Sequence, residues 1–380
     1  MTLGGVHADL ACTACHTAAY PCKVPAASNC GDCHAGYEKI LTGAMATRAA
    51  EQAFAEEAFG RYDPQFFSVN CQGCHLQGCQ DCHGSGHNLA RPGNDACLSC
   101  HKGYFTGTEY LGLAPREDSL RYQRGPQRDG EHYLKMLPDV HSEVDMTCGD
   151  CHSMASLAAG EKSSRSCRDC HVPDPQVVEH SVTRHLDGME CSACHSAWAA
   201  QEYGSFFLRL EPDSPKREYF RLRGGESPDY LRSAYLRQQD APPLGLNSAG
   251  RVSPIRPEFI AFYSDLRAGA TPTTENRLLA ARWKAFFPHT VRPGSVLCEG
   301  CHDNPRRFVL EAPEQRIYQL QEDGLSLSSF WARDGQQVVN GAFLEEERVR
   351  ALSLTSPDYI RKSLDKWQRL LKNVESSSVR

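Results

Sequence analysis

Apolar positions recur at helical spacing in three segments of the chain. In residues 43–60 they stand four positions apart within an alanine-rich stretch, at Ala46, Ala50, Phe54 and Ala58. In residues 272–287, which begin with a proline after Thr271, they fall on one helical face at Leu279, Trp283, Phe286 and Phe287. These patterns predict a linker helix and a second helix that ends just before His289.

The third segment lies at the C-terminus and has the clearest helical pattern. Ser356 is placed to cap the helix, Pro357 occupies its first turn, and the apolar stripe consists of Ile360, Leu364, Trp367 and Leu371. Such a stripe usually docks on the protein's own core. A surface for a partner is the alternative.

Strands are predicted mainly in the second half of the chain. Aromatic and β-branched composition predicts strands at residues 206–210 and 219–223, whereas residues 242–257 are rich in Pro and Gly and predict an extended loop. Asp-Gly turns separate residues 316–321, 325–332 and 336–340, which predicts a three-stranded meander. Residues 102–147 carry no such signal, and we expect a loop with one helical turn.

Composition indicates a folded protein. The chain has 380 residues, of which 40% are hydrophobic and 23% charged, enough for two domains at about 100–200 residues each. We expect no membrane span, because no apolar run approaches the roughly 20 residues that a spanning helix needs. The first residues lack the pattern of a signal peptide, so an export signal has been removed or was never included. A net charge of -6 argues against nucleic acid as a partner.

Cysteine is the outlying residue type. The chain has 19 cysteines, 17 of them before residue 195, and 18 of the 19 fall in nine copies of the pentapeptide C-x-x-C-H. Cys22 is left over. The nine motifs, in chain order, contain Cys12 and Cys15, Cys30 and Cys33, Cys71 and Cys74, Cys79 and Cys82, Cys97 and Cys100, Cys148 and Cys151, Cys167 and Cys170, Cys191 and Cys194, and Cys298 and Cys301.

A histidine directly follows the second cysteine of every motif: His16, His34, His75, His83, His101, His152, His171, His195 and His302. C-x-x-C-H is the attachment signature of c-type haem, in which two thiols form thioethers to the porphyrin and the histidine becomes the proximal ligand of the iron. Disulfides, zinc sites and iron–sulfur sites also use C-x-x-C pairs, but they do not require this histidine. We therefore predict about nine covalent haem c groups.

On these motifs the chain resembles the multihaem c-type cytochromes, densely over residues 12–195 and once more over 298–302. The resemblance implies haem attachment outside the cytoplasm, and therefore a periplasmic or extracellular protein. The fold class that we expect is a multihaem cytochrome c, mostly irregular with short helices around stacked haems, plus a small α+β C-terminal appendage. We expect three parts: an eight-haem domain at 1–195, a low-cysteine segment at 196–302 returning to the ninth motif, and a haem-free appendage at 303–380.

The seven histidines outside the motifs are candidate distal ligands: His7, His87, His132, His141, His180, His185 and His289. Four of them lie shortly before a motif, which resembles other multihaem cytochromes, where such a histidine often ligates a neighbouring haem. Seven spare histidines complete at most seven bis-histidine haems. Two haems therefore need another solution.

Three solutions are open for these two haems. A methionine can be the sixth ligand, a neighbouring subunit can donate a histidine, or a haem can keep an open position that binds substrate. The candidate methionines are Met45, Met136, Met146, Met154 and Met189. Lys102 and the unpaired Cys22 are further candidates, although an ordinary surface or core role is the simpler interpretation of each.

Nine closely spaced haems favour electron transfer over catalysis, and we assign no catalytic residue. The haems would change the net charge from -6 to about -15, which would steer basic patches of redox partners toward the protein. Expected partners are other redox proteins or cytochromes, a membrane quinol-oxidising complex, or copies of the chain itself. The alternative is a multihaem reductase of a nitrogen or sulfur oxyanion, although the C-x-x-C-K motif of ammonia-forming nitrite reductases is absent. Haem storage or a structural role is a third possibility.

Overall fold

The computed structural model describes residues 7–16, 30–72, 75–84, 87–101, 109–110, 124–128, 131–135, 139–218, 223–224, 228–270, 277–294, 296–315 and 333–377. Its contacts divide the chain into two units, one of Met1–Phe105 with Ser142–Cys170 and one of Thr106–His141 with His171–Arg380. These boundaries differ from the predicted ones at 195 and 302. Ala193 of the eighth motif is buried in one core with Leu244 and Val252, so this motif belongs with the second unit.

The first unit consists of short helices around the motifs. They are η2 (Cys12–Ala14), η3 (Tyr37–Leu41), α2 (Ala44–Thr47), α3 (Ala49–Phe59), α4 (Phe66–Asn70), α5 (Gln80–His83), α6 (Asn94–Leu98), α8 (Cys148–Cys151), α9 (Met154–Ala158) and η6 (Cys167–Asp169). The predicted helix at 43–60 is confirmed as α2 and α3, which are separated at Arg48 by a left-handed φ of 38°. Phe59 and Phe66 stack with ring centroids 4.3 Å apart and are buried.

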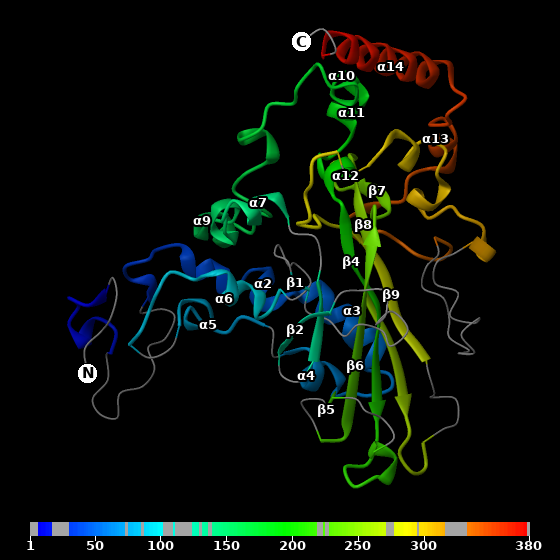
Figure 1. The fold of residues 1–380 in the computed structure, drawn as a ribbon. Helices are drawn as coiled ribbons and strands as arrows, with labels where there is room; N and C mark the ends of the chain where they lie inside the picture. Colours follow the sequence, from blue (N-terminus) through cyan, green and yellow to red (C-terminus); the bar gives the residue numbers. More distant parts are fainter. Residues whose placement is uncertain are drawn as a thin grey trace. The chain divides into compact units, whose positions relative to one another are not determined.

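The second unit is built on a seven-stranded sheet in the order β10-β7-β8-β4-β6-β5, with β9 paired to β8. Its strands are β4 (Trp198–Arg209), β5 (Arg223–Gly224), β6 (Tyr230–Asp240), β7 (Leu244–Asn247), β8 (Val252–Asp265), β9 (Arg277–Ala285) and β10 (Gly341–Ala342). The long strands run side by side in Figure 1. β8 pairs in parallel with β4 and antiparallel with β9, and the strand prediction at 206–210 is confirmed through Arg209.

The helix predicted at 272–287 is wrong. Residues 277–285 form β9, which pairs with β8 from Ile255 to Tyr263. Leu279 and Trp283 are spaced for one helical face, but a spacing of four positions also suits one face of a strand. Pairing with the aromatic strand β8 therefore decides the conformation, since tertiary context overrides a weak helical pattern.

Two loop predictions are also wrong. Residues 242–257 form β7 and the start of β8, joined by a turn in which Gly250 has a φ of 72°. In the segment 102–147 a three-stranded sheet of β1 (Glu109–Tyr110), β2 (Arg124–Arg128) and β3 (Glu131–Lys135) precedes the predicted helical turn, α7 (Val140–Glu143). Prolines in these segments weakened the strand signal, because proline cannot donate to a ladder.

The remaining elements of the second unit are short, apart from the last helix. They are α10 (Val178–Ser181), α11 (Thr183–Gly188), α12 (Ser192–His195), η7 (Pro215–Glu218), η9 (Cys298–Gly300), η10 (Pro305–Phe308), η11 (Pro313–Gln315), α13 (Glu346–Arg350) and α14 (Pro357–Ser377). Of the predicted meander, residues 316–332 lie outside the described residues, and Val338 forms an isolated bridge to Trp283. Residues 219–222 also lie outside them.

Helix α14 confirms the predicted C-terminal helix and its cap, because the Tyr359 N–H donates to Ser356 Oγ at 3.2 Å. The stripe is exposed, however, with Trp367 at 62% and Leu371 at 61%, so the expected docking of this stripe on the core is wrong. A polar face holds the helix instead, through an ion pair from Lys366 to Glu179. No helix among the described residues combines the length and apolar character needed to cross a membrane.

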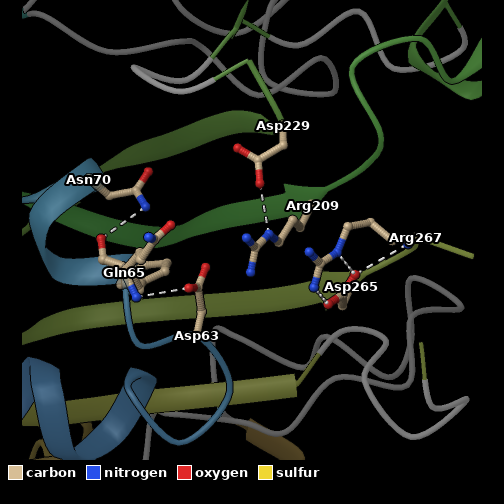
Figure 2. A network of polar contacts seen from close by, with 8 residues as sticks. Asp63, Gln65, Asn70, Arg209, Asp229, Asp265 and Arg267 are labelled. Atoms are coloured by element: carbon tan, nitrogen blue, oxygen red, sulfur yellow. Dashed lines mark hydrogen bonds and ion pairs between the residues drawn. The ribbon is translucent and has the colours of Figure 1, made fainter. Parts of the chain in front are cut away.

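Ion pairs fix one end of the large sheet (Figure 2). Arg209 Nε donates to Asp229 Oδ2 at 2.8 Å, and Arg267 donates to Asp265 at 2.7 Å. The hydrogen bond from Arg267 lowers the pKa of Asp265. The stabilisation from this pair is therefore present above the ordinary aspartate pKa and is lost as the pH falls.

Replacing Trp283 tests the core of the sheet. Its side chain is fully buried and its ring lies 5.6 Å from that of Phe343, so Trp283→Ala is expected to lower the free energy of unfolding by about 3–5 kcal/mol. The matched variant Trp367→Ala removes an exposed indole and should cost less than about 0.5 kcal/mol. Urea unfolding followed by circular dichroism measures both. Equal losses would contradict the assignment of Trp283 to the core.

Candidate haem-binding site

Most C-x-x-C-H motifs fold as one helical turn. In seven of the nine, the histidine N–H donates to the carbonyl of the first cysteine at 2.8–3.1 Å, as in His16 to Cys12 and His302 to Cys298. This turn brings residues three and four positions apart to the same side. The two thiols and the imidazole of a motif therefore face one direction, as attachment to a single flat group requires.

Aspartates inside several motifs stabilise the start of these turns. The carboxylates of Asp150 and Asp169 accept the backbone N–H groups of Thr147 and Ser166 in capping boxes. Asp81 accepts the backbone N–H groups of Gln77 and Gly78. The hydrogen bonds lower the pKa of Asp150 and Asp169. The motif is thus a structured turn in the polypeptide itself.

Histidines from distant parts of the chain meet in pairs, each joining one motif histidine to one spare histidine. The ring centroids are 6.0 Å apart for His7 and His34, 6.1 Å for His16 and His87, 6.0 Å for His141 and His171, 6.0 Å for His180 and His195, and 6.2 Å for His185 and His302. The first two pairs lie in the first unit and the other three in the second. Five spare histidines are therefore brought to five different motifs.

The spacing of these pairs fits a haem iron between them. An iron bonded to one nitrogen of each ring at about 2.0 Å, with each nitrogen about 1.1 Å from its ring centre, separates two trans imidazoles by about 6.2 Å. All five separations lie between 6.0 and 6.2 Å. Among the described residues, no group of three or more His, Cys, Asp or Glu side chains is arranged to hold a metal ion by itself.

Hydrogen bonds orient many of these rings through Nδ1. His75, His83, His195 and His302 engage the carbonyls of Ala46, Ala90, Arg292 and Leu352, and the spare His185 engages the carbonyl of Glu179, at 2.7–3.2 Å. A hydrogen bond at Nδ1 places the proton there and leaves Nε2 as the ligand atom. Burial lowers the pKa of His101 and His185, which also favours the neutral form that binds a metal.

The histidines of motifs three to six, His75, His83, His101 and His152, are not in these five pairs. Both spare histidines of the first unit, His7 and His87, are already paired with other motifs. Of the remaining two spare histidines, His289 lies against the Phe287 ring at 4.7 Å. The side chain of His132, on β3, lies outside what the structure describes.

Some of the other candidate ligands lie near motifs, and several lie outside the described residues. The Met45 carbonyl accepts the N–H of Leu76 at 3.0 Å, which places α2 next to motif three. Met154 begins α9, and Met189 follows α11. Cys22, Cys74, Lys102 and Met136 lie outside the described residues. No disulfide joins any of the 17 described cysteines.

Cysteines of different motifs lie close together. In the first unit, Cys30 interacts with Cys79, Cys82 with Cys97, and Cys97 with Cys148 through a hydrogen bond that lowers the pKa of Cys97 to about 6 and raises that of Cys148. In the second unit, burial raises the pKa of Cys194 to about 12, with a smaller contribution from Cys301. Motifs two, four, five and six are therefore neighbours in series, and motifs eight and nine form a second group.

The sequence analysis missed two charged residues at these sites, because neither belongs to a C-x-x-C-H motif. Asp139 accepts a hydrogen bond from His141, and Arg307 interacts with Cys194 and Cys301. Only the short spacing from Asp139 to His141 in the sequence could have suggested the first of them. Searches of protein-family models, of curated proteins and of solved structures find nothing that matches this chain.

Proposed function

We propose that this chain is an electron-transfer protein that carries about nine covalent haem c groups. The observation that carries the proposal is the set of five histidine pairs at the separation of two axial imidazoles. The motif cysteines would hold the porphyrins through thioethers, and the paired imidazoles would be the axial ligands. Haem supplies reversible one-electron chemistry when it is bound.

The nearness of different motifs supports a relay. Thiols of motifs two, four, five and six touch or influence one another in turn, and so do those of motifs eight and nine. Groups attached to neighbouring cysteines must themselves be neighbours. A function that needs only one haem would not require such a series.

The location and partners belong to the same proposal. Attachment of haem c outside the cytoplasm implies a periplasmic or extracellular protein. The acidic surface that the haem propionates would add favours partners with basic patches, such as other cytochromes or a membrane quinol-oxidising complex. Further copies of this chain are an alternative partner.

One observation favours a second candidate function, reduction of a nitrogen or sulfur oxyanion. Five of the seven spare histidines are paired with motifs one, two, seven, eight and nine, which leaves only His132 and His289 for the four haems of motifs three to six. At least two haems of motifs three to six would then carry a ligand of another kind or an open position. An open position is where a substrate would bind.

Low-temperature EPR of the oxidised protein, followed by carbon monoxide addition after reduction, tests both functions. The relay predicts that every haem is low-spin and that adding carbon monoxide changes nothing. A high-spin signal that shifts with nitrite, hydroxylamine or tetrathionate would favour the reductase. A protein without a Soret band would overturn both.

A further inference from the structure

Asp139 is a buried carboxylate behind the spare histidine of motif seven. It is 3% exposed, and its Oδ1 accepts the Nδ1–H of His141 at 2.9 Å. Two backbone N–H groups, those of His141 and Val291, donate to the same carboxylate. The other histidines with a described Nδ1 hydrogen bond engage backbone carbonyls instead.

This contact changes the electronic character of His141. A carboxylate that accepts the Nδ1 proton raises the basicity of the imidazole and orients the ring. It also places a negative charge 2.9 Å from the ring nitrogen Nδ1, on a carboxylate that is itself 3% exposed. Both effects stabilise the oxidised form of an iron more than the reduced form.

Arg307 has the opposite charge and lies between motifs eight and nine. Its side chain is 2% exposed, and its two terminal nitrogens donate to the carbonyls of Pro242 and Ala193, the latter at 2.7 Å and within motif eight. Nε is buried and has no hydrogen-bond partner among the described residues. Cys194 and Cys301 lie beside the guanidinium. Once both sulfurs are thioethers they are neutral, so the positive charge would act on both attached groups.

A continuous set of contacts joins Asp139 to motif eight, in which the Ala193 carbonyl accepts a hydrogen bond from Arg307. Asp139 accepts the N–H of Val291, and the next residue, Arg292, accepts the Nδ1–H of His195 at 3.2 Å through its carbonyl. The N–H of Arg292 in turn donates to the His195 carbonyl at 2.8 Å. Consecutive residues thus hold the distal ligand of motif seven and the proximal ligand of motif eight, all within the second unit.

We propose that Asp139 and Arg307 set the direction of electron flow in this unit, from the site of His141 and His171 to the sites of motifs eight and nine. This inference rests on the proposed function. One electron leaves the first site, which is oxidised, and enters the second, which is reduced. Asp139 makes the first site the stronger donor, and Arg307 makes the others the stronger acceptors.

Redox titration of the haem-loaded protein, resolved by EPR of its low-spin signals, tests the proposal. Asp139→Asn keeps the shape of the side chain but removes its charge. It should raise the reduction potential of one haem by at least about 59 mV, which for one electron is a tenfold change in the equilibrium constant. Arg307→Gln should lower two components by a similar amount, whereas Arg307→Lys, which keeps the charge, should restore them. A merely structural role for Arg307 would make Lys and Gln behave alike.

Matched controls remove the same charges at exposed positions. The controls are Asp145→Asn and Arg306→Met. Asp145 lies six residues from Asp139, and Arg306 is the neighbour of Arg307 in η10. Neither control should change the reduction potential of any haem. Shifts equal to those of the buried variants would overturn the proposal, because they would show only a change in net charge.

The reduction potentials of the wild-type protein give a further test, in which histidine variants serve only to assign each EPR signal to its haem. The signal abolished by His141→Ala should be reduced at a lower potential than the signals abolished by His180→Ala and His185→Ala. The reverse order would overturn the gradient and leave the haem relay intact. A protein without haem would give no titration at all, which distinguishes failure of the proposed function from failure of this inference.

Discussion

Preventing haem attachment is expected to leave the first unit unfolded while the sheet of the second unit persists. Among the described residues, 23 hydrophobic side chains are buried, and only Ile40, Ala55, Phe59 and Phe66 belong to the first unit. Four side chains are too few for an independent core, so under the proposed function the haems would supply most of its apolar interior. The sheet buries Trp283, Tyr263 and Phe262 without any help from a cofactor.

Hydrogen exchange measured by mass spectrometry checks this expectation on the full chain made with and without the haem-attachment machinery. Amides of α3 and α8 should lose their protection in the haem-free chain, and amides of β8 should keep it. The β8 peptides are the internal control. Equal protection of α3 and α8 in the two preparations would contradict a haem-built interior.

Removing a paired spare histidine is expected to convert one haem from low-spin to high-spin. His185 faces His302 at 6.2 Å, so His185→Ala would take away the distal ligand of motif nine. One haem of the nine should then bind carbon monoxide in the reduced state, and the other eight should not change. EPR integration and carbon monoxide titration give the number of high-spin haems directly.

Replacing each of the other four paired spare histidines tests the remaining pairs. His7→Ala, His87→Ala, His141→Ala and His180→Ala should each produce one high-spin haem, and combining two of them should produce two. Gln315→Ala, at an exposed position in the second unit, is the control and should produce none. The pairing is wrong if His185→Ala leaves every haem low-spin.

The helical turn of the C-x-x-C-H motifs could be predicted from sequence because its interactions are local. Two thiols and an imidazole within five residues need only one helical turn to face the same way, and the sequence contains both the residues and the turn. The histidine pairs could not be assigned in the same way. His7 lies five residues before Cys12 but pairs with His34, and His185 lies before motif eight but pairs with His302 of motif nine.

The errors in the fold prediction have a common cause. The spacing of Leu279 and Trp283 suits a helix and a strand alike, and only the neighbouring β8 selects the strand. The same holds for α14, whose sequence pattern located the helix and its cap but not the face that docks. Lys366 and Tyr359 hold that helix against Glu179 and His302, and the apolar stripe stays exposed.

The mass of the purified full chain, measured after denaturation, tests the central claim most directly. Thioether bonds survive unfolding, whereas a group held only by axial ligands is lost. The account predicts the mass of the polypeptide plus nine haems, with a proportionate loss of one haem when Cys298 and Cys301 are both replaced by alanine. The unmodified polypeptide mass, from a preparation with no Soret absorbance, would contradict it.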